Sequence, residues 1–259
     1  MSKTIIGSYE LIRQIGEGGF GRTYEGRHVL LPEVKACLKQ NISINLEDTK
    51  LLQREAGLLA KIHHHSLPTF RDLVRVDDGS YVLIMSYIEG KGLEKAIAKH
   101  HSIHPEDVSW ITQRLLNALH YLHHMGMIHG DVKPPNIIVQ PEKHNAYLVD
   151  YGLATFQPKA GTKPDGYTPI FVPPEIKEGK PPLPVSDLYS LGLSMIFALG
   201  GNPLTKEMPD HVPSKLQDFY KEMTQFDPLQ RTSWEKEDLV KKLSSIRDEV
   251  FGRKTSYTG

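Results

Sequence analysis

The order of the expected elements predicts an α+β fold, with strands in the first third of the chain and helices in the remainder. Short apolar runs of strand type, separated by turn residues, occupy residues 9–87 around one helical stretch. Beyond them, apolar residues recur at helical spacing. With 259 residues and 39% hydrophobic content, the chain is long enough to form one large domain or two lobes.

A glycine-rich turn joins the first two expected strands, Tyr9 to Ile15 and Thr23 to Arg27. Its sequence is Gly16-Glu17-Gly18-Gly19-Phe20-Gly21. A dinucleotide-binding turn would need a helix directly after the glycines, but a strand-like run follows here. We therefore interpret the turn as a hairpin lid whose backbone can approach phosphate groups closely, because glycine carries no Cβ.

The short run Ala36-Cys37-Leu38-Lys39 ends in a lysine that has a candidate partner. From Thr49 to His63 the apolar residues recur at helical spacing, and Glu55 falls within this apolar stripe. A carboxylate on a buried face needs a partner, which Lys39 can supply. The alternative is an ordinary solvated lysine.

Cys37 is the single cysteine of the chain, so no intrachain disulfide can form, and a small buried side chain is favoured over a reactive thiol.

Two further strands and two helices follow. The strand-like runs Phe70 to Val76 and Tyr81 to Tyr87 are joined by Asp77-Asp78-Gly79, which is typical of a hairpin turn. Pro105 to His124 has one apolar helical face, whereas Leu188 to Leu199 is apolar almost all round. A helix without a polar face is expected to be buried.

The most informative part of the chain is an expected hairpin with polar residues at its open end. Its strands are Ile137 to Val139 and Ala146 to Val149, joined by a turn-rich segment. In an antiparallel pair, the residue before the first strand lies beside the residue after the second, so Asn136 and Asp150 should meet. An amide oxygen and a carboxylate together suit Mg²⁺, which prefers oxygen ligands and often shares them with substrate phosphates.

A base and a positive charge lie just before this hairpin, in His129-Gly130-Asp131-Val132-Lys133-Pro134-Pro135-Asn136, and Asp150-Tyr151-Gly152 follows it. Such residues suit phosphoryl transfer, which depends on positioning and charge neutralisation. The two motifs resemble the catalytic loop, H-R-D-x-K-x-x-N, and the metal-binding D-F-G of the eukaryotic-type (Hanks-type) Ser/Thr protein kinases. Gly130 replaces the arginine, which makes this a non-RD variant, and Tyr151 replaces the phenylalanine. Neither change removes a reacting group.

The resemblance covers roughly Tyr9 to Val250. Residues 168–175 are similar to the T-P-x-Y-x-A-P-E end of the activation segment, and residues 227–231 to the segment whose arginine, here Arg231, pairs with the glutamate, here Glu175. It implies a two-lobed protein-kinase fold, with one helix and a small antiparallel sheet in the N-lobe and a larger, mainly helical C-lobe. One domain would span residues 9–250 (N-lobe with hinge 9–88, C-lobe 89–250), followed by a polar tail, 251–259.

The resemblance also implies ATP and Mg²⁺ as cofactors and a role for each site residue. Asp131 would accept the proton of the attacking hydroxyl, Lys133 would neutralise the γ-phosphate, and the Thr168 hydroxyl would help to hold both. Asn136 and Asp150 would hold Mg²⁺. The residues implied in nucleotide binding are Gly16, Gly18, Gly19, Phe20 and Gly21 of the lid, Cys37, Lys39 with its partner Glu55, and Met85, Ser86 and Ile88 at the back of the adenine pocket and the hinge.

Two other functions remain open. An H-G-D sequence with a downstream asparagine also resembles the aminoglycoside and choline kinases, which phosphorylate small molecules. Those relatives usually lack Lys133, the glycine lid and the P-E segment, so a protein substrate is favoured. The second alternative is a pseudokinase that binds nucleotide and partners without turnover, which the presence of all the reacting residues makes the minor one.

Composition sets the remaining expectations. The net charge is zero, which gives no indication of nucleic acid or an anionic membrane as a partner. We expect no membrane insertion, because the apolar helix at Leu188 to Leu199 is shorter than the roughly 20 residues that a bilayer needs and residues 1–8 lack the apolar core of a signal peptide. With its single cysteine, the chain is expected to be cytoplasmic. The resemblance implies a protein substrate with Ser or Thr, whose identity stays open, as does the oligomeric state.

Overall fold

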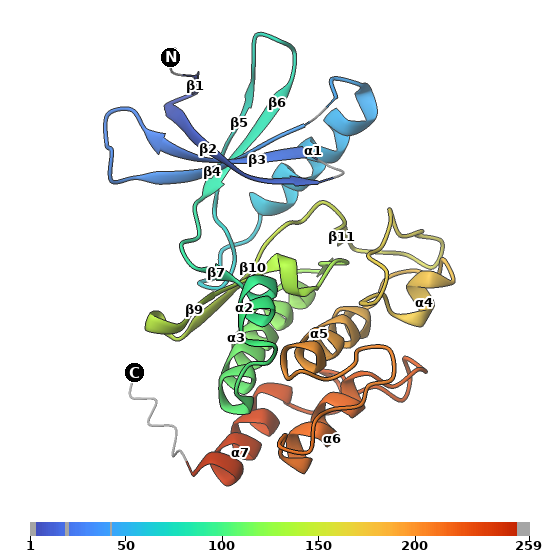
Figure 1. Ribbon diagram of the computed structural model, residues 1–259. Helices are drawn as coiled ribbons and strands as arrows, with labels where there is room; N and C mark the ends of the chain where they lie inside the picture. The colour runs from blue at the N-terminus through green and yellow to red at the C-terminus, as the bar shows by residue number, and fades with distance from the viewer. Residues whose placement is uncertain (1–3, 19–20, 42, 253–259) are drawn as a thin grey trace. The chain divides into compact units, whose positions relative to one another are not determined.

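The computed structural model describes residues 4–18, 21–41 and 43–252. The chain divides into two compact units, with the boundary between Glu89 and Gly90. The first unit is an antiparallel sheet with one helix, and the second is mainly helical (Figure 1). The α+β class predicted from the order of the sequence elements is therefore confirmed.

In the described part of the first unit, six strands form one sheet in the order β1-β2-β3-β4-β6-β5, and every neighbouring pair is antiparallel. The core of the sheet is made by Ala36, Leu38, Val82 and Ile84, which lie at alternate positions of their strands, as a half-buried strand requires. The strands are β1 (Ile5–Ile6), β2 (Tyr9–Gly18), β3 (Gly21–His28), β4 (Lys35–Gln40), β5 (Phe70–Arg75) and β6 (Tyr81–Ser86).

The helix of this unit, α1 (Leu46–Leu59), begins three residues before the predicted start at Thr49 and ends four residues before His63. The Asn45 side chain caps it by accepting a hydrogen bond from the Asp48 amide at 2.7 Å. Acidic residues in the first turn favour the positive end of the helix dipole. The prediction missed this start because the apolar stripe, on which it was based, begins only inside the helix.

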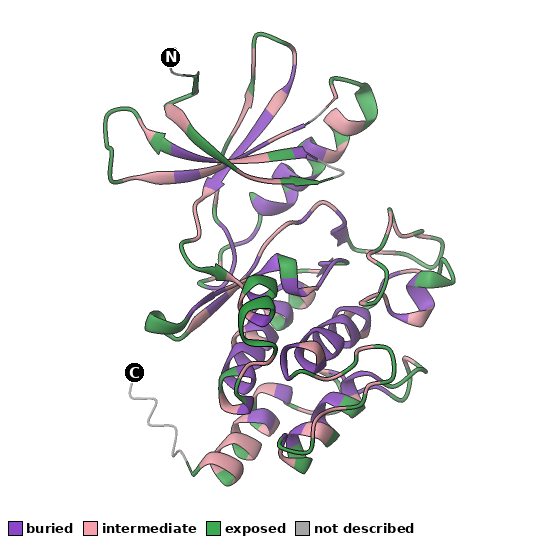
Figure 2. Cartoon of the chain, viewed as in Figure 1, coloured by how far each residue is buried: buried purple, intermediate pink, exposed green. Residues whose placement is uncertain are grey.

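The second unit is built around two helices, α3 (Pro105–His124) and α5 (Pro184–Ala198). The bounds of α3 are those predicted, and Pro105 occupies its first turn, where no amide donor is needed. Figure 2 shows α5 buried almost all round, as its apolar sequence predicts, but the helix starts at Pro184, before the apolar run.

Short elements surround these two helices. The other helices are α2 (Leu93–His100), α4 (Pro174–Lys177), α6 (Ser214–Met223) and α7 (Leu239–Phe251), with 3₁₀ turns η1 (Pro134–Asn136) and η2 (Pro141–Lys143); the strands are β7 (Lys91–Gly92), β8 (Met127–Ile128), β9 (Ile137–Gln140), β10 (Asn145–Leu148) and β11 (Thr155–Phe156). Between α5 and α6, residues 199–213 contain no helix or strand. Of the helices that the structure describes, none combines the length and hydropathy needed to cross a membrane.

Candidate active site

Strands β9 and β10 form the predicted hairpin, with Ile137 opposite Leu148. At its open end the Val149 amide donates to the Asn136 carbonyl at 2.9 Å. Asn136 and Asp150 therefore leave the hairpin at the same end. Asp150 has a φ of +67°, in the left-handed region that aspartate tolerates better than most residues.

Asp131 lies beside this end of the hairpin and is held by three side chains. Its Oδ2 accepts from Lys133 Nζ at 2.7 Å and from the Asn136 amide nitrogen at 3.0 Å. The Thr168 hydroxyl donates to Oδ1 at 2.8 Å and itself accepts from Lys133 Nζ at 2.8 Å. The carboxylate is only 8% exposed. The structure thus brings together four of the predicted site residues in one polar cluster of the second unit.

Asp187, near the start of α5, binds the backbone of the loop that precedes Asp131. Its carboxylate accepts from the amides of His129 at 2.8 Å and Gly130 at 2.9 Å, and it contacts His123 Nε2 at 2.9 Å. The ring of His129 is fully buried and packs edge-on against Tyr151, with 4.9 Å between ring centroids. Burial lowers the pKa of His129, so this ring favours its neutral form.

In the first unit, Lys39 and Glu55 form a buried ion pair. Lys39 Nζ donates to both Glu55 carboxylate oxygens, at 2.9 and 2.8 Å. The two residues are 7% and 3% exposed. Glu55 is the charged residue on the buried face of α1, as its position in the apolar stripe predicts, so the solvated alternative for Lys39 does not hold.

Comparison with known proteins identifies the family. The family model described as "Protein kinase domain" matches residues 9–245. The chain belongs to the protein kinase domain family. Two curated relatives from Synechocystis sp. are 30% identical to it: serine/threonine-protein kinase F, over 78% of this chain and 45% of the relative, and serine/threonine-protein kinase D, over 84% and 44%. Serine/threonine-protein kinase pkn3 of Myxococcus xanthus is 28% identical over 78% of this chain and 39% of its own length.

These relatives identify the chain as a Hanks-type Ser/Thr kinase domain with the two-lobed kinase fold, the family that the sequence motifs predicted. The kinase domain spans less than half the length of the curated relatives that it matches.

The end of the activation segment is anchored in the core of the kinase C-lobe. Arg231 Nη1 and Nη2 donate to the two carboxylate oxygens of Glu175 at 2.6 and 2.7 Å. The Ser186 hydroxyl adds a third bond to Glu175 at 2.7 Å. Burial raises the pKa of Glu175, but the hydrogen bonds from Arg231 and Ser186 outweigh it, and the pKa lies below its ordinary value.

The predicted glycine lid lies in the hairpin between β2 and β3, in which Gly16 pairs with Thr23 and Gly18 with Gly21. No helix follows, which excludes the dinucleotide-binding turn. A Cβ on Gly21 would lie 2.5 Å from the Gln40 carbonyl oxygen, so this glycine is needed for close packing against β4. The predicted lid residues Gly19 and Phe20 lie outside the described residues.

The predicted adenine-side residues lie on adjacent strands of the N-lobe sheet. Cys37 is half-buried on β4 and pairs with Met85 of β6, which is 7% exposed. Ser86 is tied to the segment before β5: its amide donates to the Thr69 carbonyl at 2.9 Å, and its hydroxyl accepts from the Thr69 amide at 2.9 Å. Ile88 is half-buried in the stretch that follows.

Sequence reasoning gave no role to His123 and Trp234, although both are connected to the catalytic loop. Trp234 Nε1 donates to His123 Nδ1 at 2.8 Å, and His123 contacts Asp187. These partners are separated by 111 and 64 residues in the sequence, so no local motif joins them. The signal that could have drawn attention to His123 is a histidine on the apolar side of the last helical turn before the catalytic loop.

Proposed function

We propose that this kinase domain transfers the γ-phosphate of ATP to the hydroxyl of a Ser or Thr residue in a protein. The observation that carries the proposal is the fixed Asp131 carboxylate with Lys133 and Thr168 at its side. The Ser/Thr kinase relatives support the choice of acceptor.

In the proposed reaction, the substrate hydroxyl oxygen forms a bond to the γ-phosphorus while the bond from that phosphorus to the bridging oxygen of ADP breaks. Asp131 orients the hydroxyl and accepts its proton. A carboxylate offers about four lone-pair positions, and three are used by Lys133, Thr168 and Asn136, so one remains for the substrate. Lys133 neutralises charge on the transferred phosphoryl group.

Nucleotide binding would be shared by the predicted N-lobe residues. Lys39, kept in position by Glu55, would hold the α- and β-phosphates, and the backbone of the Gly16–Gly21 lid would cover them. The main chain from Ser86 to Ile88 would bond the adenine, with Met85 behind it and Cys37 above it. The buried Lys39–Glu55 pair supports this assignment, because it fixes the position of the Lys39 ammonium group.

The donor atoms near Asp131 fit Mg²⁺. The Asn136 amide nitrogen is bound to Asp131, which leaves its amide oxygen for a cation, and Asp150 supplies a carboxylate. Oxygen-only donors of this kind match a hard divalent cation. Asn136 and Asp150 would hold the ion, which neutralises phosphate charge when it is bound. Their common position at one end of the hairpin supports the assignment.

A protein substrate is preferred to a small molecule because the Thr168 hydroxyl, from the activation segment, is part of the Asp131 cluster. The aminoglycoside and choline kinases usually lack that segment. The pseudokinase alternative is disfavoured by the intact Asp131, Lys133 and Asn136 cluster. We further propose a reducing compartment such as the cytoplasm, in keeping with Cys37 as the single cysteine.

The test is incubation of the purified protein with labelled ATP, Mg²⁺ and a mixed panel of proteins and small metabolites. Label should appear on Ser or Thr of proteins. Asp131→Asn should reduce the rate by on the order of 10²-fold or more while ATP affinity stays nearly unchanged, because Asp131 handles the proton and not the nucleotide. The matched control is Asp72→Asn on the exposed side of β5. Label on metabolites alone, or parent-like turnover in Asp131→Asn, would refute the proposal.

A further inference from the structure

A series of hydrogen bonds connects Trp234, which lies far along the sequence, to the backbone of the catalytic loop. Trp234 Nε1 donates to His123 Nδ1 at 2.8 Å, and His123 Nε2 lies 2.9 Å from Asp187 Oδ2. The same carboxylate accepts the amides of His129 and Gly130, which directly precede Asp131. The side chains of His123 and Asp187 are 3% and 2% exposed.

The partners decide which ring nitrogen of His123 carries the proton. An indole N–H can only donate, so Nδ1 of His123 must accept and carries no proton. A neutral imidazole then has its single proton on Nε2, from which it donates to Asp187. A ring with the proton on Nδ1 would meet the Trp234 N–H as a second donor, and Asp187 would face an unprotonated nitrogen.

We propose that Trp234 is a positioning residue for phosphoryl transfer: by donating to Nδ1, it holds the His123 ring in the orientation in which Nε2 binds Asp187, and so keeps Asp187 bonded to the backbone of His129 and Gly130. The proposal rests on the proposed kinase activity. Trp234 touches neither substrate nor reacting atoms in this account and acts only through His123. It has a second contact that holds its ring in place, a stacking of 4.6 Å between centroids with His120.

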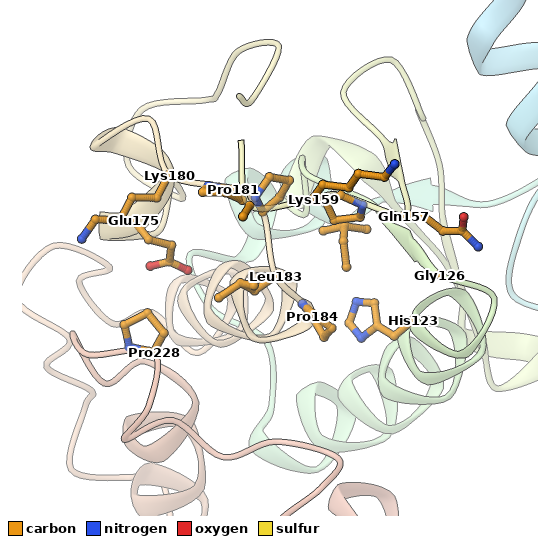
Figure 3. Close-up of a pocket in the computed structure, with 14 residues that line it drawn as sticks. His123, Gly126, Gln157, Lys159, Glu175, Lys180, Pro181, Leu183, Pro184 and Pro228 are labelled. Atoms are coloured by element: carbon orange, nitrogen blue, oxygen red, sulfur yellow. The ribbon is translucent and has the colours of Figure 1, made fainter. Parts of the chain in front are cut away.

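A cavity of about 510 Å³ in the second unit gives access to His123 (Figure 3). His123 is one of its lining residues, together with Gly126, Leu183 and Pro184. Two charged side chains of the lining have partners: Glu175 binds Arg231, and Lys180 binds Glu178 at 2.6 Å. Because His123 lines the cavity, a small molecule such as imidazole can reach the position of its ring from there.

The first experiment compares two tryptophan variants. Trp234→Phe keeps a ring against His120 but removes the N–H, and we expect kcat to fall roughly 3- to 10-fold, the effect of losing one neutral hydrogen bond, with KM for ATP unchanged. The control, Trp110→Phe, also removes a buried indole N–H, in that case one that binds Asp107 within the same helix at 3.0 Å. Its kcat should stay within about twofold, since that bond joins two residues of α3 and does not lead to Asp187.

The second readout does not depend on activity. Long-range ¹H–¹⁵N spectra of the histidine rings report the tautomer of His123, assigned by the signal lost in His123→Gln. The parent and Trp110→Phe should show the Nε2–H form. Trp234→Phe should keep the Nε2–H form, which Asp187 still selects, but its Nδ1 signal should shift because that nitrogen loses its hydrogen-bond donor. If the protein has no kinase activity at all, this spectrum still tests the hydrogen-bond chain.

The third experiment is chemical rescue. His123→Ala joins the ring volume to the cavity, so added imidazole can enter, accept from Trp234 and donate to Asp187. Imidazole should restore part of kcat in His123→Ala, and less in the variant that also carries Trp234→Phe. 1-Methylimidazole has no N–H and should not restore it. If His123→Ala does not fold, His123→Gln replaces it in the kcat comparison, because its amide can still donate to Asp187 and should retain more activity than Trp234→Phe combined with His123→Gln.

Parent-like kcat in Trp234→Phe together with an unchanged His123 spectrum would overturn the proposal. Equal losses in Trp234→Phe and Trp110→Phe would do the same, because they would show a general effect of removing a buried indole donor. If all variants and the parent lack activity, the proposed function fails, while the spectrum still decides the tautomer.

Discussion

Removing the arginine of the Glu175–Arg231 pair should destabilise the C-lobe strongly. The Arg231 side chain is fully buried and binds both carboxylate oxygens of Glu175. Its guanidinium also donates to the carbonyls of Gln225 at 2.7 Å and Phe226 at 3.0 Å, and it lies 4.5 Å from the centre of the Tyr189 ring. One side chain therefore joins the end of the activation segment to the loop after α6.

In Arg231→Met the apolar stem is kept, but the Glu175 carboxylate stays buried with the Ser186 hydroxyl as its remaining partner among those described above. Breaking a buried pair from one side costs about 3–5 kcal/mol of unfolding free energy. Because the bonds from Arg231 hold the pKa of Glu175 below its ordinary value, the pair stabilises the fold above the unfolded-state pKa, and this contribution is lost as the pH falls through the folded-state pKa. The loss in Arg231→Met should thus be largest near neutral pH and shrink on acidification.

Urea unfolding followed by tryptophan fluorescence is the suitable assay, because both tryptophans, Trp110 and Trp234, lie in the second unit and report its unfolding. The control is Lys215→Met, which breaks the exposed pair with Glu249 and should cost about 0–1 kcal/mol. A loss below about 1 kcal/mol in Arg231→Met at neutral pH would contradict the argument, since it would place this buried pair in the range of exposed ones.

Three further predictions concern Asp150, Gly130 and His64. Asp150→Asn should abolish turnover and make nucleotide binding insensitive to Mg²⁺ in calorimetry, whereas Asp72→Asn should do neither; equal Mg²⁺ dependence in parent and Asp150→Asn would exclude Asp150 as the principal ligand. The segment at residues 154–167 contains Thr155 and Thr162 as acceptors for phosphorylation; phosphatase treatment, Thr155→Ala and Thr162→Ala should each leave most of the initial rate, because Gly130 has no side chain to bind a phosphate on this segment, and a large drop that preincubation with ATP restores would refute this. Burial lowers the pKa of His64 to about 4, so unfolded chains bind the extra proton first and stability should fall as the pH drops from 6.5 towards 4. His64→Asn keeps an acceptor for the Ser66 amide and should flatten that dependence in thermal unfolding followed by circular dichroism.

Most of the fold could be predicted because the main elements carry strong local signals. Helix α3 has an apolar face along its whole length and a proline at its first position, and its bounds were predicted to the residue. Helices α2, α6 and α7 received no prediction, since their apolar faces are short and flanked by polar residues. The predicted start of α1 was wrong, because the capping side chain of Asn45 determines where this helix begins.

For the candidate site, the sequence predicted contacts between residues that are close together along the chain. Asn136 and Asp150 were expected to meet because a hairpin joins them, and the structure places both at its open end. The contacts of Asp187 with His123 and the catalytic loop could not be derived, because they depend on how α3 and α5 pack. Periodicity shows which residues are buried, but it does not show which buried groups bind each other.

Gly130 illustrates how a change from the family pattern can be accommodated by the backbone. It has a φ of +77°, and a Cβ there would lie 2.6 Å from the Leu153 carbonyl oxygen, so any side chain at this position would require the backbone to shift. The amide of the same residue is held by Asp187 at 2.9 Å. The catalytic loop is thus ordered by the contact of its backbone with Asp187 of α5 and by the bond from Thr168 to Asp131, neither of which needs a phosphate. These contacts within the C-lobe hold the catalytic loop without a phosphate, which is why we expect its activity to be independent of phosphorylation at Thr155 and Thr162.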